Sequence, residues 1–208
     1  MRMRKKPNLA ARLEKCAHLI VESPEPLRGC WLDEYRYGEL HLEIGCGKGR
    51  FTVETAKSYP NVLLIALEKL ADAMIIALEN AAAEEIKNVR FMNTDAENLA
   101  DFFAPGEVSR IYINFCDPWP ANRHAKRRLT SRRFLEIYKK MLRQSGEIHL
   151  KTDNLALFEY SLAEFERGGF TILEESRDLH GKGSAGIMTD YEMKFHKMGQ
   201  PICFCIAK

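Results

Sequence analysis

LHLEIGCGKGR, residues 40–50, decides the fold of this chain. The first five residues form a short apolar run that contains Glu43, and three glycines then alternate with Cys46 and Lys48 before helical spacing begins. A strand, a glycine loop and a helix N-terminus in this order bring the backbone close to a ligand. We therefore expect a ligand-binding turn at the carboxyl end of the first strand.

The same alternation of short apolar runs and helical spacing continues along the chain. The expected strands are 40–44, 62–67, 89–92, 110–116 and 147–151, and the expected helices are 50–58, 70–86, 96–103, 130–143 and 154–167. Such βαβ units predict a doubly wound α/β fold with a mainly parallel sheet and helices on both faces. Residues 170–175 and 201–207 have no strong helix pattern between them, so we expect an antiparallel hairpin at the sheet edge.

Length and composition fit one globular domain. With 208 residues, 46% of them hydrophobic and 29% charged, the chain can bury a core without disulfides or a structural metal. The proline-containing residues 1–38 lie outside the alternation, so we expect a basic N-terminal arm and a leading helix there and the main domain at 39–208. No apolar run is long enough to span a bilayer or to form a signal core, which predicts a cytoplasmic protein. The six cysteines lack metal-binding spacing and predict reduced, mostly buried thiols.

Positive charge is concentrated in two places. The chain has 31 basic and 29 acidic side chains, for a net charge of +2. Yet residues 121–143 hold nine lysines and arginines and a single acid, Glu136, while residues 1–6 add four more basic side chains. Two basic blocks on a nearly neutral chain predict a strip that binds phosphates.

The glycine loop has the spacing GxGxG, which differs from the GxGxxG of dinucleotide-binding enzymes. A tight turn without a ligand stays an alternative. Glu43 would repel a pyrophosphate but suits a cationic or amine-bearing ligand. Glu68 follows the second strand, 21 residues after Gly47, where an acid can bind ribose hydroxyls. Taken alone, Glu68 would sooner be a surface residue beside Lys69, and it is the glycine loop that favours the ribose contact.

Two later strands also end in acids. Asp95 could hold an adenine amino group or cap the helix that follows it, and both readings stay open. Asp117-Pro118-Trp119-Pro120 follows the fourth strand. Because each proline biases the preceding residue toward extended geometry, we expect Asp117 and Trp119 on a stiff loop. In a doubly wound sheet, that loop borders the crevice where the strand order reverses.

Together these motifs resemble the bacterial tRNA (guanine-N7-)-methyltransferase family, within the class I S-adenosylmethionine-dependent methyltransferases. The matching pieces run in order over nearly the whole chain: MRMRKKP at the start, EIGCGKG (43–49), Glu68, NTDA (93–96), NFCDPWP (114–120), RHAKRRL (123–129), KTD (151–153) and TDYE (189–192). The glycine loop is common to class I methyltransferases, whereas DPWP followed by RHAKRR is much narrower. One position departs from the family, because Ala121 stands where a lysine usually follows DPWP.

The resemblance implies an activity and partners. It implies transfer of the methyl group of S-adenosylmethionine to N7 of a guanosine in the variable loop of tRNA, at tRNA position 46. It further implies an enzyme that is a monomer or homodimer and that needs no metal and no membrane.

The resemblance also implies roles for individual residues. It implies cofactor contacts by Glu43, Gly45, Gly47, Glu68, Asp95 and Asp117, with Asp117 as the catalytic acid. It implies substrate contacts by Asp153, Thr189, Asp190, Tyr191 and Glu192, and RNA contacts by Arg123, His124, Lys126, Arg127 and Arg128.

The expected chemistry depends on positioning. Guanine N7 carries no proton, so no general base is needed to create the nucleophile, and Asp117 suits an electrostatic and orienting role. Asp153 or Glu192 could accept the guanine N1–H and amino group. Alternatively, Asp153 caps a helix, and Thr189 to Glu192 form a capping box. Tyr191 and Trp119 are candidates for stacking on an unstacked base.

Three other functions stay open at this point. An NAD-dependent oxidoreductase shares the strand, the glycine loop and the acid after the second strand, but GxGxG and Glu43 count against it. A non-catalytic RNA-binding module accounts only for the basic strip. A methyltransferase acting on an exocyclic nitrogen is the third, because DPWP loosely resembles the D/N-P-P-Y loop of amino-methylating enzymes.

Overall fold

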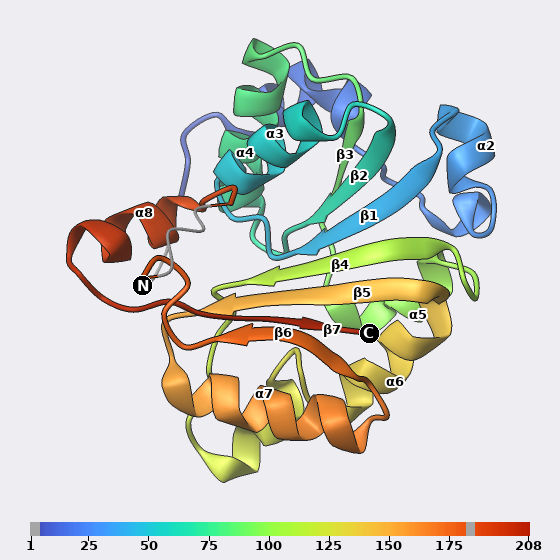
Figure 1. Ribbon diagram of the computed structural model, residues 1–208. Helices are drawn as coiled ribbons and strands as arrows, with labels where there is room; N and C mark the ends of the chain where they lie inside the picture. Colours follow the sequence, from blue (N-terminus) through green and yellow to red (C-terminus); the bar gives the residue numbers. More distant parts are fainter. Residues whose placement is uncertain (1–4, 182–185) are drawn as a thin grey trace.

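One seven-stranded sheet organises the chain in the computed structural model, which describes residues 5–181 and 186–208 (Figure 1). The strand order is β3-β2-β1-β4-β5-β7-β6. The strands are β1 (Glu39–Ile44), β2 (Val62–Leu67), β3 (Val89–Met92), β4 (Val108–Asn114), β5 (Leu142–Thr152), β6 (Ile172–Ser176) and β7 (Cys203–Ala207). The first five strands pair in parallel, and β7 runs antiparallel to both β5 and β6. The predicted fold, including its antiparallel edge, is confirmed.

Helices cover both faces of this sheet (Figure 1). They are α1 (Leu9–Lys15), α2 (Trp31–Tyr35), α3 (Arg50–Ser58), α4 (Ala71–Ala83), α5 (Leu99–Phe102), α6 (Arg132–Met141), α7 (Leu155–Arg167) and α8 (Asp190–Lys197), with short 3₁₀ helices η1 (Ala17–Leu19), η2 (Glu25–Leu27), η3 (Ala96–Asn98) and η4 (Asn122–Arg127). Side chains alternate along β4: Ile111 and Ile113 join the core under α6 and α7, while Tyr112 joins the core under α3 and α4. Strands buried on both faces explain the continuous apolar runs in the sequence.

Most helices and strands begin and end within a few residues of the positions predicted from the sequence. The expected bounds of α3, β2 and β3 match the observed ones, whereas the helix expected at 96–103 is divided into η3 and α5. The segment between the last two strands, which has no strong helix pattern in the sequence, contains the eight-residue helix α8. Within the described residues, no helix is long and apolar enough to cross a membrane. All six cysteines are free thiols, four of them buried.

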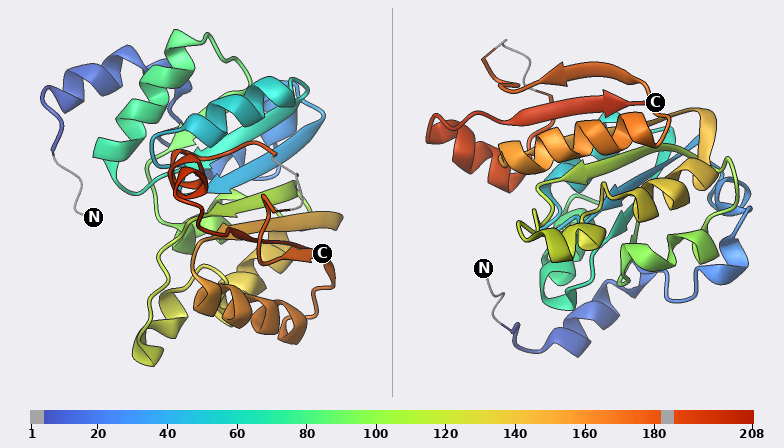
Figure 2. Two further views of the ribbon diagram at one scale, coloured as in Figure 1. Left: turned by 60° about the vertical axis from the view of Figure 1, so that its left-hand side comes forward. Right: turned by 90° about the horizontal axis from the view of Figure 1, so that it is seen from below.

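The N-terminal segment packs against the sheet domain. Val21 donates its N–H to the carbonyl of Phe91 in β3 at 2.9 Å, and Trp31 is fully buried in the core beneath α6. Arg12 of α1 pairs with Glu79 of α4, so that α1 lies beside α4 (Figure 2). Residues 17–35 therefore share the hydrophobic cores of the main domain. The basic residues Arg2 and Arg4 of the expected arm lie outside the described residues.

Candidate active site

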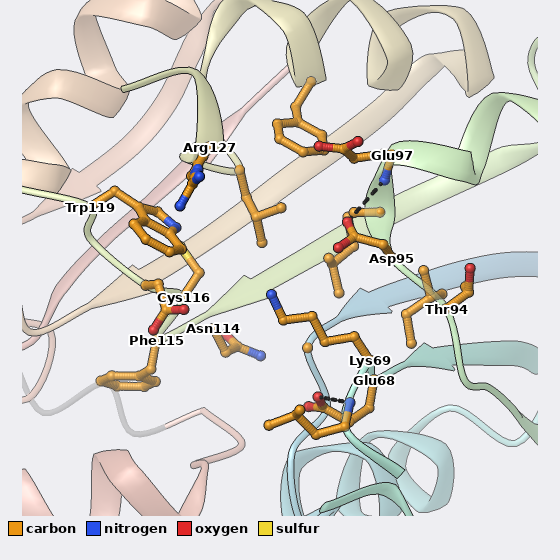
Figure 3. Close-up of a pocket in the computed structure, with 18 residues that line it drawn as sticks. Glu68, Lys69, Thr94, Asp95, Glu97, Asn114, Phe115, Cys116, Trp119 and Arg127 are labelled. Atoms are coloured by element: carbon orange, nitrogen blue, oxygen red, sulfur yellow. Dashed lines mark hydrogen bonds between the residues drawn. The ribbon is translucent and has the colours of Figure 1, made fainter. Parts of the chain in front are cut away.

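A cavity of about 450 Å³ opens at the carboxyl ends of β1, β2 and β4 (Figure 3). This is the point where the strand order reverses, between β1 and β4, which is where doubly wound sheets bind ligands. Gly45, Glu68, Asp95 and Asp117 all line this cavity. The volume lies within the range of sites for small organic ligands.

The glycine loop is shaped by positive φ angles and by a close helix contact. Gly47 has a φ of 57° and donates its N–H to Glu68 at 3.0 Å. Gly49 has a φ of 80°, and a Cβ atom there would collide with Ala77 of α4. Gly49 therefore permits close packing of α3 on α4, whereas the third glycine of GxGxxG permits close packing of a helix on a strand.

Glu43 lies beneath the loop. Its side chain is 2% exposed and accepts a hydrogen bond from the Thr52 hydroxyl at 2.6 Å. Burial raises the pKa of Glu43 to about 7, although the Thr52 hydrogen bond acts in the opposite direction. Among the described residues that line the cavity, neither Glu43 nor Gly47 is found. The predicted cofactor contacts by these two residues therefore stay predictions.

Glu68 and Asp95 lie on two sides of the cavity (Figure 3). Both carboxylate oxygens of Glu68 are held by backbone, since Oε2 accepts from Gly47 and Oε1 accepts from Leu70. Asp95 uses one oxygen, Oδ1, to accept the N–H of Glu97, which caps the short helix η3. The capping role proposed for Asp95 is confirmed, and it leaves the second oxygen for a ligand.

The loop that carries Asp117 is folded differently from the sequence-based expectation. Trp119 has a φ of 42° instead of the extended geometry expected before a proline, and Phe115 has a φ of 52°. Arg128 explains the turn at Trp119. Its Nε donates to the carbonyl of Pro118 at 3.1 Å and its Nη2 to that of Trp119 at 3.0 Å.

The predicted RNA contacts separate into two groups. Arg123, Lys126 and Arg127 are exposed on η4, and Arg127 also lines the cavity with its guanidinium 4.9 Å from the Trp119 ring centroid. His124 is half-buried and packs edge-on against Trp119.

Arg128 differs from its neighbours in the same basic run. It is only 9% exposed, and its guanidinium stacks 4.2 Å from the ring centroid of Tyr160 in α7. Its Nε and Nη2 donate inside the protein, so we assign the exposed strip to Arg123, Lys126 and Arg127.

Helix α8 is fixed to the end of β5 by a buried ion pair. The capping box is present, because Glu192 N–H donates to the Thr189 hydroxyl at 3.0 Å and Thr189 N–H donates to the Glu192 carboxylate at 3.3 Å. The Lys151 ammonium donates to both oxygens of Glu192 at 3.0 Å. Glu192 is fully buried, whereas Asp190 and Tyr191 are exposed at the start of the helix.

Asp153 is exposed directly after β5. The alternative that it caps α7 is wrong, because the next residue, Asn154, accepts the N–H of Leu157 at 2.8 Å and is the cap. The sequence contained this signal, since asparagine is as good a cap as aspartate. No sequence signal pointed to the cavity-lining Phe115 or to the internal role of Arg128.

The comparisons with known proteins agree with this geometry. A family model described as "Putative methyltransferase" matches residues 38–205. The tRNA (guanine-N(7)-)-methyltransferases of Geobacillus sp. (strain WCH70) and Geobacillus kaustophilus (strain HTA426) are each 43% identical to this chain, over 100% of it and 96% of the relative.

Solved structures of methyltransferases share the fold. The 16S rRNA methyltransferase KamB is 17% identical, with a TM-score of 0.64 over 84% of this chain and 90% of that one. Phosphoethanolamine N-methyltransferase 2 of Haemonchus contortus, solved with S-adenosyl-L-methionine, is 12% identical, with a TM-score of 0.50 over 82% and 48%. With the full-length relatives, these findings show that the chain belongs to the tRNA (guanine-N(7)-)-methyltransferase family and is an S-adenosylmethionine-dependent methyltransferase.

Proposed function

We propose that this protein transfers the methyl group of S-adenosylmethionine to N7 of a guanosine in the variable loop of tRNA, at position 46. The names of the relatives support the reaction. The observation that carries the proposal is a shared cavity: Glu68, Asp95 and Asp117 line it together with Arg127, the last residue of the exposed basic strip. The same cavity thus presents carboxylates that can bind a cationic cofactor and a guanidinium that can bind the phosphates of an RNA. A tRNA substrate also favours the expected cytoplasmic location.

The cavity residues fit S-adenosylmethionine. Glu68 is oriented by two backbone N–H groups, and carboxylate oxygens keep spare lone pairs for the hydroxyls of a ribose. The second oxygen of Asp95 can accept an adenine amino group. At Gly45, which has a φ of 84°, no atom lies within 4 Å of where a Cβ would stand, so the loop leaves open space for the ligand. When bound, the cofactor supplies an electrophilic methyl group on a sulfonium.

We assign Asp117 to orienting the base and stabilising charge. It is exposed at the cavity, on the loop after β4. As N7 becomes methylated, positive charge develops on the imidazole part of guanine, and a nearby carboxylate stabilises it. No proton has to be removed from N7, so alignment of nucleophile and methyl group is the main requirement, and such alignment can supply roughly 7–11 kcal/mol.

The Watson–Crick edge of guanine is assigned to Asp153. Its carboxylate is exposed at the end of β5, the neighbour of β4 in the sheet. Two carboxylate oxygens match the N1–H and amino donors of guanine. Glu192, the other candidate, is buried against Lys151. We therefore assign Thr189 and Glu192 to holding α8 in place, so that Asp190 and Tyr191 stand where the substrate binds.

The phosphates of tRNA are assigned to the exposed strip. Replacing Arg123 and Lys126 by glutamine should weaken tRNA binding and reduce the slope of log K against log salt by about 1.5, since each phosphate contact contributes roughly 0.7–0.9. The matched control replaces Lys57 and Lys87, which lie at the end of α3 and just before β3, on the opposite edge of the sheet. A control pair with the same effect would contradict the assignment.

The reaction itself is tested with labelled S-adenosylmethionine and an unmodified tRNA transcript. Nucleoside analysis should yield 7-methylguanosine, and a transcript with adenosine at position 46 should accept no methyl group. Another methylated nucleoside would overturn the substrate, and no product from folded protein would overturn the activity. Calorimetry with S-adenosylhomocysteine and NAD, side by side, tests the oxidoreductase alternative, and gel filtration tests the expected monomer or homodimer.

A further inference from the structure

Phe115 adopts a backbone conformation that a phenylalanine rarely takes. Its φ is 52°, in the left-handed region, although its N–H still continues the strand by donating to the carbonyl of Lys151 at 2.8 Å. For a residue with a Cβ, this conformation costs roughly 1–2 kcal/mol. Such strain persists where the surroundings enforce it, often at functional sites. Phe115 lies two residues before Asp117 and lines the same cavity (Figure 3).

The strained backbone changes where the Phe115 ring points. Strand alternation puts residue 115 on the face of Ile111 and Ile113, inside the core under α6 and α7. Instead, the ring stacks beside two rings of α8. Its centroid lies 6.3 Å from that of Tyr191 and 6.4 Å from that of Phe195, with interplanar angles of 21° and 22°.

These three rings, which we call the aromatic cluster (Phe115, Tyr191 and Phe195), lie outside the hydrophobic cores. Neither core formed by the described residues includes any of them. Tyr191 is 55% exposed, among the highest values for a large apolar side chain in the described part of the protein. Core packing therefore does not offset the strain at Phe115, and the cluster leaves aromatic surface open to a ligand.

The cluster is rigidly supported. The capping box fixes the first turn of α8, and the buried pair of Lys151 and Glu192 ties that turn to β5. Helix α8 consequently lies at the carboxyl ends of β4 and β5 (Figure 1). The open ring surface is therefore already ordered before a ligand arrives.

We propose that the aromatic cluster is the stacking surface that holds the methyl-accepting purine after it leaves the tRNA stack; this inference rests on the proposed function. A base stacked by its face keeps every in-plane edge free. Its N7 edge can then face the cofactor cavity and Asp117, while its Watson–Crick edge faces Asp153. Stacking of one base on an aromatic side chain is strong enough to replace the neighbours that the base loses in the tRNA.

Single-turnover methyl transfer at saturating cofactor tests the role of the ring. Phe115→Leu keeps an apolar side chain of similar size and should lower the rate about 5- to 150-fold, the range for loss of one base stack. Phe115→Trp should restore the rate to within a few-fold of wild type. Phe115→Gly keeps the turn without strain but has no ring, so it should be as slow as the leucine variant.

Two further measurements separate stacking from a structural effect. Tyr191→Leu should slow the reaction, whereas Tyr59→Leu, at an exposed tyrosine on the opposite edge of the sheet, should not. The affinity for S-adenosylhomocysteine should stay unchanged in Tyr191→Leu and Tyr59→Leu, whose side chains do not line the cofactor cavity. In Phe115→Trp, intact tRNA should quench tryptophan fluorescence more strongly than a tRNA that lacks the base at position 46. This difference between the two tRNAs should be larger than the difference measured with the wild-type protein.

The outcomes distinguish this inference from the proposed function. If wild-type protein forms 7-methylguanosine while Phe115→Leu reacts at the wild-type rate, the stacking surface is wrong and the function stands. Equal quenching by intact and abasic tRNA would also overturn the stacking surface. If wild-type protein forms no 7-methylguanosine, the function itself is wrong.

Discussion

Arg128→Lys tests whether Arg128 holds the Asp117 loop or binds RNA. Lysine keeps the positive charge, so a residue that only attracts phosphate should tolerate it. If Arg128 instead holds the loop, a role that we call the clamp, lysine should not replace it. The guanidinium donates to the carbonyls of Pro118 and Trp119 and stacks on Tyr160. An ammonium has no planar fork with which to do all three.

The structure sets the size of the expected effect. A hydrogen bond from a charged donor contributes about 1.5–3 kcal/mol, and lysine can retain one of the two carbonyls. The stack on Tyr160 adds about 0.5–2 kcal/mol. Since the loop carbonyls belong to half-buried residues, water replaces part of the loss. We expect Arg128→Lys to lose about 2–3 kcal/mol of loop stabilisation, which lowers kcat roughly 30- to 150-fold if Asp117 must be held in place.

Two tryptophans make the loop directly observable. Trp31 is fully buried, so acrylamide quenching reports on the half-buried Trp119. Arg128→Lys should increase this quenching and lower kcat while leaving the salt dependence of tRNA binding unchanged. Arg123→Lys, at an exposed position of the strip, is the matched control and should change neither kcat nor quenching. Wild-type kcat and quenching in Arg128→Lys, or a salt slope reduced by about one unit in Arg128→Met, would refute the clamp.

Four substitutions test other parts of the site. Burial raises the pKa of Glu43 in the folded protein to about 7, so the free energy of unfolding of the apoprotein falls by on the order of 3 kcal/mol as pH rises from about 4.5 to 7. Glu43→Gln should therefore be more thermally stable than wild type across that pH window and not below it. Gly49→Ala should lower the free energy of unfolding by at least about 1 kcal/mol, measured in urea, since an alanine there must adopt a φ of 80° and its Cβ collides with α4. Lys151→Met removes the ammonium from the fully buried Glu192 carboxylate and leaves His180 Nε2, at 3.1 Å, as its basic neighbour. Chemical denaturation should therefore show a loss of stability of up to about 3–5 kcal/mol, and a loss below 1 kcal/mol would contradict the idea that this ion pair holds α8 against β5. Ala121→Lys, which restores the family's usual cation, should lower the KM for tRNA at moderate salt, and an unchanged or higher KM would remove that idea.

The central sheet could be predicted because its strands are buried on both faces. A continuous apolar run such as 62–67 has no other simple interpretation when helical patterns flank it. The acids at strand ends were also predictable, since parallel strands bring their carboxyl ends to one edge. Glu68, Asp95 and Asp117 therefore meet in one cavity although they are far apart in sequence.

Helix α8 could not be predicted because its stabilisation is not local. It has eight residues, fewer than an isolated helix needs to be stable in water. Its decisive contact is the pair of Glu192 with Lys151, 41 residues earlier in the chain. The capping-box pattern in the sequence identified the first turn of α8 but not what holds the turn against the sheet.

The burial of individual cations in the basic run RHAKRR (123–128) could not be predicted from the sequence either. Neither charge nor spacing distinguishes the cations of this run, but the fold buries Arg128 and leaves Arg123, Lys126 and Arg127 exposed. Asn122–Arg127 form a 3₁₀ helix, in which successive side chains point about 120° apart, and the chain turns at its end so that Arg128 enters the protein. Which cation turns inward depends on the carbonyls of Pro118 and Trp119, and no sequence pattern reports where those carbonyls point.

Asp117 lies midway between two left-handed residues, Phe115 and Trp119. Each of these two turns costs free energy that must come from contacts elsewhere in the structure. On one side Arg128 holds the carbonyls that follow Asp117. On the other side α8 receives the ring that precedes it. Asp117, the acid that we propose for the methyl-transfer site, is therefore held from both sides, which is why we expect activity to be more sensitive than stability to changes at either support.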